Sequence, residues 1–152
     1  MANVLDVAQY ILETEGRALS TMKLQKLTYY SQAWNLVWEE ARLYDSAIEA
    51  WANGPVVRDL YEAHRGHFSV DPSEHLGDAT QLTNADKETV DAVLRAYGHL
   101  SGQQLSDLSQ DERPWLEARR ETPTGAPSDR VINPEVMQEF FGSQFSAMAS
   151  AV

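Results

Sequence analysis

Histidine and carboxylate side chains gather in one stretch of the sequence, where their spacing raises the hypothesis of a metal site. The residues are His64, His67, Asp71, Glu74 and His75. Imidazole and carboxylate groups are ligands that zinc and other divalent metals accept. However, we expect Gly66 to end a helix between the first two histidines, and no His-Glu-x-x-His frame is present. We therefore predict solvated loop histidines and no bound metal, with a metal-dependent hydrolase kept as an alternative.

The sequence contains no recognisable motif for other kinds of catalysis. It contains no cysteine, which excludes disulfides, zinc–thiolate sites and thiol nucleophiles and is compatible with a reducing cytoplasm. It also has no Gly-x-Ser-x-Gly elbow, no phosphate-binding P-loop and no dinucleotide fingerprint. We expect no enzymatic activity and no cofactor, and we assign no catalytic, cofactor-binding or metal-binding residue.

Two lysines near the start of the second predicted helix suggest a further alternative, a DNA-binding regulator. Lys23 and Lys26 follow a short turn containing Gly16, where a recognition helix would present base contacts. Both lysines lie within the apolar arc of that helix. Burial of their aliphatic stems, or pairing of their ammonium groups with nearby acids, is therefore a simpler explanation than DNA contact. The formal charge of −11, from 12 basic and 23 acidic residues, also repels phosphate. A basic protein is therefore the expected partner, and nucleic acid is not.

The elements that position these side chains are mainly helices. The 152 residues fit one domain. Apolar periodicity and capping residues predict helices over Val4–Glu15, from Ser20 or Thr21 to about Glu40, from Pro55 to Gly66, from Thr83 to Gly98, after Ser101, from Pro114 and after Asn133. The second helix is apolar over roughly two thirds of its circumference, which is typical of a helix surrounded by others. We predict a compact bundle of six or seven helices around this long central helix, with a minor β element in the middle.

The segments outside the helices carry weaker signals. A period-two pattern at Ile48 and Ala50 predicts a short strand, and 68–70 and 79–82 are candidates for a small hairpin. The Pro/Gly/Ser-rich stretch 121–130 is the candidate for a linker. We expect a single domain over 1–141 and a flexible tail over 142–152. No stretch approaches the roughly 20 apolar residues of a membrane helix, and no signal-peptide pattern is present, so we expect a cytoplasmic protein without a membrane partner.

A Gly-Pro corner joins the predicted strand to the third predicted helix. Trp51 and Asn53 come directly before Gly54 and Pro55. Glycine permits a tight turn, and proline fixes φ and is tolerated in the first turn of a helix. We therefore expect the main role of the corner to be the reversal of the chain direction. A half-buried tryptophan beside it would also offer aromatic surface on which a partner can anchor.

Three segments resemble one known family. They are "MKLQKLTYYSQAWNLVW" (22–38), "IEAWANGPVVRDLYEAHRG" (48–66) and "RPWLEAR" (113–119). Their motifs K-L-Q-K-L-x-Y-Y, A-W-x-x-G-P-V-V and Pro-Trp resemble those of the Panacea antitoxin domain, whose members are also called SocA-like or phage-associated GepA-like proteins. The order and spacing hold from about Val4 to Arg120.

The resemblance implies an antitoxin of a bacterial or phage toxin–antitoxin system that binds its cognate protein toxin directly. A SocA-like member instead delivers its toxin to a cytoplasmic protease, which would add a second partner. The broad apolar helix and four tryptophans also leave room for a homodimer. We expect six residues in the partner-binding surface: Trp51, Asn53, Gly54, Pro55, Tyr61 and Tyr30.

Overall fold

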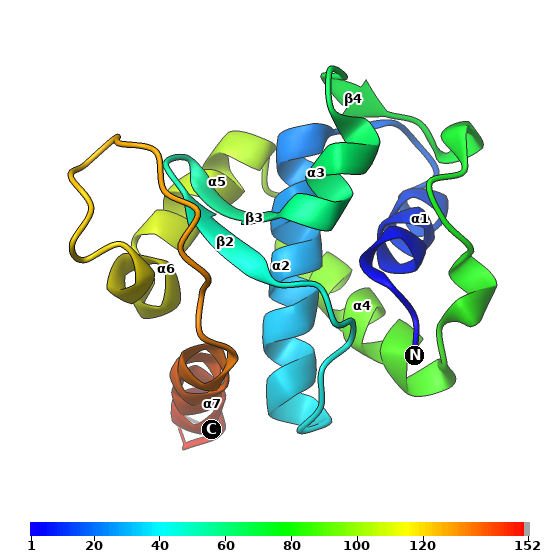
Figure 1. Ribbon diagram of the computed structural model, residues 1–152. Helices are drawn as coiled ribbons and strands as arrows, with labels where there is room; N and C mark the ends of the chain where they lie inside the picture. The colour runs from blue at the N-terminus through cyan, green and yellow to red at the C-terminus, as the bar shows by residue number, and fades with distance from the viewer. Residues whose placement is uncertain (151–152) are drawn as a thin grey trace.

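One helix, α2 (Thr21–Trp38), forms the centre of the computed structural model, which describes residues 1–150 (Figure 1). Around it lie α1 (Val4–Glu15), α3 (Arg58–His64), α4 (Asn84–Tyr97), α5 (Gly102–Gln110), α6 (Arg113–Ala118) and α7 (Pro134–Ser150). Fourteen of the 18 residues of α2 are buried, because α1, α3, α4, α5 and α7 all pack against it. The predicted central helix is confirmed, and so is the mainly α fold class.

The remaining secondary structure is short. In the described part of the chain, two 3-10 helices cover Pro72–Glu74 and Ala79–Gln81, and four strands of two to four residues form two separate antiparallel pairs. Within residues 1–150, none of the helices combines the length and the apolar character needed to cross a bilayer.

The predicted helix caps are present. The side chain of Ser20 accepts a hydrogen bond from the backbone of Lys23 at the start of α2. Thr83 and Asp86 exchange reciprocal side-chain-to-backbone hydrogen bonds, and Ser101 and Gln104 do the same. These capping boxes satisfy backbone N–H groups that have no partner inside the helix. They fix where α4 and α5 begin.

The Gly-Pro corner is part of a β-hairpin and not the start of a helix. Strand β2 (Ile48–Trp51) pairs with β3 (Gly54–Val57), so that Ala50 lies opposite Pro55 and Trp51 opposite Gly54. Helix α3 begins only at Arg58. The prediction that Pro55 occupies the first turn of a helix is therefore wrong, although the predicted short strand is confirmed.

The strand accepts Pro55 because its nitrogen points away from the hairpin partner. The backbone N–H of Val57 donates to the side chain of Gln25 on α2 and not to β2. Alternate residues of an antiparallel strand direct their N–H groups to the same side, so the nitrogen of Pro55 also faces away from β2. A proline at this position removes no hydrogen bond from the ladder.

The proline-rich stretch 121–130 leads the chain back across the hairpin. Arg130 accepts a hydrogen bond from the backbone N–H of Ala50, and Ile132 donates one to Ile48, both at 2.8 Å. Residues 130–132 therefore cover the outer edge of β2. The chain then enters α7, where Gln138 donates to the carbonyl of Leu36 at the end of α2. The stretch thus joins two elements that both pack on the same core.

Two weaker predictions are wrong. The hairpin expected between 68–70 and 79–82 does not form, because β4 (Ser69–Val70) pairs with β1 (Leu19–Ser20). Residues 79–81 instead form a 3-10 turn in which the side chain of Asp78 accepts the N–H of Thr80. Such local hydrogen bonds compete with extended structure.

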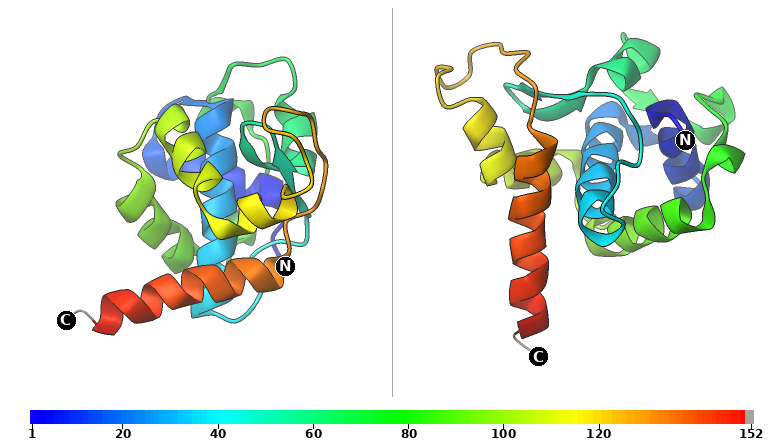
Figure 2. Two further views of the ribbon diagram at one scale, coloured as in Figure 1. Left: turned by 90° about the vertical axis from the view of Figure 1, so that its left-hand side faces the viewer. Right: turned by 60° about the horizontal axis from the view of Figure 1, so that its bottom comes forward.

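The last helix does not end at Gly142 but continues to Ser150. Phe145 packs edge-on against Trp34 and Trp38, with ring centroids 6.4 and 6.5 Å apart, and these contacts offset the helix-breaking tendency of glycine. Figure 2 shows this end of α7 extending past the other helices. Of the predicted tail 142–152, residues 151–152 lie outside the described part of the chain.

The packing around Gly54 generates a stability prediction. Gly54 has φ +114°, and an added Cβ would lie 2.9 Å from Cε of Lys26 and 3.0 Å from Oγ of Ser109. Gly54→Ala combines backbone strain with this clash, so we expect the free energy of unfolding to fall by about 3 kcal/mol. Urea denaturation followed by circular dichroism measures it.

Gly16→Ala is the matched control. Gly16 also has positive φ, +66°, but nothing lies within 4 Å of an added Cβ. We expect a loss of only about 1 kcal/mol there, from the backbone alone. Equal losses in the two variants would contradict the close approach of the hairpin to α2.

Candidate partner-binding groove

The inner side of the hairpin is held by polar side chains of α2. The ammonium group of Lys26 donates to the carbonyl of Pro55 at 3.1 Å. Gln25 accepts the N–H of Val57 at 2.8 Å and donates to its carbonyl at 3.2 Å. Lys26 is only 2% exposed, and this burial lowers its pKa to about 8. The Lys-Leu-Gln-Lys motif therefore positions the hairpin.

Neither lysine of this motif is available to nucleic acid. Lys26 is occupied by Pro55, and the ammonium group of Lys23 donates to the carbonyl of Gly98 at 2.7 Å. Lys23 is 8% exposed. A recognition helix must present its cations at the surface, and the first turns of α2 do not.

The outer part of the hairpin is held by α5 and α6. The hydroxyl of Ser106 donates to the carbonyl of Asn53. The indole N–H of Trp115 donates to the carbonyl of Trp51, and Arg119 donates to that of Ala50, both at 2.8 Å. The Arg119 guanidinium also lies over the Trp115 ring, 5.1 Å from its centroid. The Pro-Trp segment thus fixes the strand that precedes the turn.

Trp51 is fixed from several directions while part of its surface stays accessible. Its ring meets Tyr61 edge-on at 4.9 Å and carries the Arg58 guanidinium 5.3 Å from its centroid. Its indole N–H donates to Glu49 at 2.8 Å, and Glu49 also accepts two hydrogen bonds from Arg58. The indole is therefore preorganised, which lowers the entropy lost when a partner binds.

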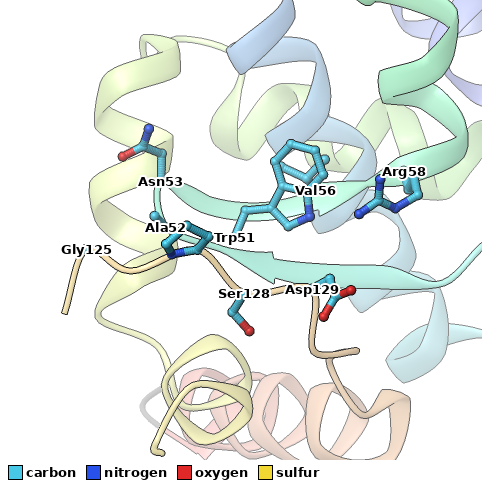
Figure 3. A pocket seen from close by; sticks show the side chains of 9 residues that line it. Trp51, Ala52, Asn53, Val56, Arg58, Gly125, Ser128 and Asp129 are labelled. Carbon is cyan, nitrogen blue, oxygen red and sulfur yellow. The ribbon is translucent and has the colours of Figure 1, made fainter. Parts of the chain in front are cut away.

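An open groove of about 550 Å³ lies between the hairpin and the loop after α6 (Figure 3). Its lining residues are Trp51, Ala52, Asn53, Val56, Arg58, Gly125, Pro127, Ser128 and Asp129. We call this the hairpin groove. Its lining is mostly apolar, with a few polar groups at the rim, a composition that suits binding of a partner side chain or short segment.

The structure places five of the six predicted contact residues at or beside the hairpin groove. Trp51 and Asn53 line the hairpin groove. Tyr61 is half-buried and supports Trp51 from behind. Gly54 and Pro55 are buried against α2, so their role is to shape the hairpin.

Tyr30 is not an accessible contact residue, and placing it in the partner-binding surface was wrong. It is fully buried, stacks on Tyr97 at 4.3 Å, and donates its hydroxyl to the carboxylate of Glu112 at 2.7 Å. Its position on the central helix explains this, because Tyr97 of α4 and Phe141 of α7 pack against its ring. Tyr30 therefore belongs to the core.

The carboxyl of Glu112 is a buried acid with a perturbed pKa. It is 6% exposed, at the junction of α5 and α6. Burial raises its pKa from 4.5 to about 7, a shift that the hydrogen bond from Tyr30 opposes and the nearby charge of Asp111 reinforces. This carboxyl accordingly becomes charged inside the protein only near neutral pH.

The structure does not bring the histidine and carboxylate side chains of residues 64–75 together into a metal site. Within residues 1–150, no three His, Asp or Glu side chains are placed to hold one metal ion. His64 is 6% exposed and lies 3.0 Å from the side-chain nitrogen of Gln25, and burial lowers its pKa. His64 was expected to be a solvated loop residue, but it ends α3 and packs against α2 instead.

Several residues at or behind the groove carried no signal in the sequence. Arg58 lines the groove as the first residue of α3, two positions after Val56. Glu49, which binds Arg58, lies on β2 two positions before Trp51. Pro127 and Asp129 lie about 70 residues further along the chain than Arg58, in a stretch whose composition indicated only a loop. Their place in the groove depends on the pairing of 130–132 with β2.

Residues 24–116 match the family described as "Antitoxin SocA-like, Panacea domain". The chain belongs to this family. The matched range covers more than half of the 152 residues, and it includes most of the central helix, the hairpin and the first residues of α6. Searches against curated proteins and against solved structures gave no significant match.

The three motifs that resemble the Panacea family converge in space. Lys26 of the first, Pro55 of the second and Trp115 of the third all bind the hairpin or lie within it. The Panacea domain of this chain is therefore organised around the β2–β3 hairpin, whose exposed side forms one wall of the groove.

The buried acid beside Tyr30 generates a prediction on pH dependence. Between about pH 4.5 and 7 the folded protein keeps the Glu112 proton that the unfolded chain loses. Stability therefore falls as pH rises through this range, by up to about 3 kcal/mol. Glu112→Gln keeps an acceptor for Tyr30 and removes the charge, so we expect this variant to be more stable than the wild type at pH 8 and equal to it at pH 4.5. Urea unfolding across this pH range measures the difference.

Tyr30→Phe is the companion variant. It leaves the carboxyl in place but removes its hydrogen bond, which raises the Glu112 pKa further. We expect lower stability throughout and a decline that extends to higher pH. A Glu112→Gln profile with the wild-type slope would contradict the assignment.

Proposed function

We propose that this protein is the antitoxin of a bacterial or phage toxin–antitoxin pair and that it neutralises its cognate toxin by direct contact, without catalysis. Membership of the SocA-like Panacea family supports an antitoxin role. The observation that carries the proposed mode of action is the hairpin groove, because Ser106 of α5 and Trp115 of α6 hold the backbone of Asn53 and Trp51 at its wall.

The physical character of the groove supports protein binding. Trp51 is partly accessible, and tryptophan and arginine are the residues most often found at the energetic centre of protein interfaces. The indole and the Arg58 guanidinium are already ordered by Glu49 and Tyr61, so little side-chain entropy is lost on binding. The formal charge of −11 would speed encounter with a basic toxin.

Direct contact serves either of two outcomes, blockade of the toxin or its delivery to a cytoplasmic protease. We propose blockade, because the groove is part of a rigid surface that requires no second protein. The two outcomes separate in a purified system: a blocking antitoxin inhibits its toxin with no protease present, whereas a delivery factor does not.

The functional prediction concerns Trp51 and Asn53. The experiment expresses the product of the adjacent reading frame in cells and measures survival with and without the antitoxin. We expect Trp51→Ala to weaken toxin binding by at least about 30-fold and to abolish survival, because truncation of a central tryptophan costs about 2 kcal/mol or more. Asn53→Ala, on the exposed turn, should reduce survival in the same direction.

The control is Phe68→Ala. Phe68 is 85% exposed and lies outside the hairpin groove, so its removal should leave survival unchanged. Circular dichroism and thermal melting of all three variants distinguish lost contact from unfolding. Survival with both groove variants would remove the groove from the interface, and an adjacent product that the wild type cannot silence would contradict the antitoxin function.

A further inference from the structure

Among the residues that the structure describes, Arg58 is the cation that lines the hairpin groove, and it is already neutralised. Arg58 donates from Nε to one oxygen of Glu49 at 3.0 Å and from its terminal nitrogen to the other at 2.9 Å. Burial of Glu49 opposes its ionisation, but hydrogen bonds from Arg58 and Trp51 outweigh this, so its pKa is lowered. The pair therefore stays ionised and contributes no net charge.

The opposite rim of the groove carries a carboxylate with no such partner. Asp129 is exposed at the end of the loop after α6, and within residues 1–150 it makes no ion pair and no side-chain hydrogen bond. It acts on Arg58 only as a weak, more distant charge. With Arg58 and Glu49 cancelling, Asp129 leaves the groove with a net charge of −1.

Apolar surface lies between this carboxylate and the turn of the hairpin. Val56 and the partly exposed Trp51 form the hairpin wall (Figure 3). Pro127 belongs to the loop wall. Asn53, at the turn, also lines the groove. An elongated ligand with an apolar stem and a cationic end matches this sequence of surfaces.

We infer that the hairpin groove receives an arginine side chain presented by the partner protein. The arginine stem would lie on Val56 and Pro127, and its guanidinium would bind the Asp129 carboxylate. This inference rests on the proposed function in that the partner is the toxin, and it names the chemistry by which the toxin is held.

Arginine fits better than the other ligands of similar size. A phosphate or carboxylate would be repelled by Asp129 and by the acidic surface as a whole. A lysine ammonium is a compact, strongly hydrated charge, whereas the planar guanidinium binds a carboxylate through two parallel hydrogen bonds and stacks on aromatic surface such as Trp51. A purely apolar residue would leave Asp129 desolvated without a partner.

The test uses the full chain and synthetic peptides, so that it does not require the toxin. Four peptides, acetyl-Ala-Val-X-Val-Ala-amide with X as arginine, citrulline, lysine or glutamate, are titrated while NMR follows the indole N–H resonance of Trp51. Trp51→Phe assigns that resonance. We expect a saturable shift with the arginine peptide and an affinity roughly three- to tenfold lower with citrulline, which has the same shape without the charge.

Asp129→Asn should reduce the affinity for the arginine peptide to the citrulline level. Asp45→Asn is the matched control, because Asp45 is exposed, makes no ion pair within residues 1–150 and lies outside the groove. Equal affinity for arginine and citrulline, equal affinity for lysine, no binding of any peptide, or an equal loss in Asp45→Asn would each overturn the inference.

The outcome separates from that of the proposed function. If Trp51→Ala abolishes toxin rescue in cells while Asp129→Asn leaves peptide binding unchanged, the antitoxin function is supported and the proposal that the hairpin groove binds arginine is wrong. If the arginine peptide binds through Asp129 but the wild-type protein does not neutralise the product of the adjacent reading frame, arginine binding by the hairpin groove is supported and the antitoxin function is wrong.

Discussion

The structure depends on a buried cation, the ammonium group of Lys26, which binds the carbonyl of Pro55. Burying an ammonium group is unfavourable, and its lowered pKa of about 8 reflects that cost. The cost is tolerated because Lys26 satisfies a carbonyl of β3 that faces away from β2. Gln25 does the same for Val57. The central helix therefore acts as the hydrogen-bonding partner that the edge of a two-stranded sheet would otherwise lack.

This constraint explains why a four-residue strand pair is stable in a helical protein. An isolated two-stranded hairpin is marginal in water. Here β3 is bound to α2, the turn carbonyl of Asn53 is bound to Ser106 on α5, and the carbonyl of Trp51 is bound to Trp115 on α6. Each bond comes from a different helix, so the position of the turn is determined by the packing of the whole bundle. The hairpin is therefore expected to stay rigid as long as the helices that hold it remain packed in the core.

The hairpin groove follows from the same arrangement. Its hairpin wall is set by α2, α5 and α6, and its loop wall is set by the pairing of 130–132 with β2. A loop that only connected two helices would not fix the position of Asp129 relative to Arg58. Because its last residues join the sheet, the loop is held at both ends. The groove can thus present a charge on one side and an aromatic ring on the other in a fixed relation.

The sequence by itself determined the helices, their caps and the central position of α2, since these follow from local periodicity and from side chains that bond to nearby backbone groups. It also indicated that Trp51 and Asn53 belong to a surface. Only the tertiary structure decided that Pro55 lies in a strand, that Tyr30 is buried against Glu112, and that Asp129 lies beside the hairpin. These depend on contacts between residues dozens of positions apart. No local pattern encodes them, because the partner that makes a residue buried, paired or exposed belongs to another element.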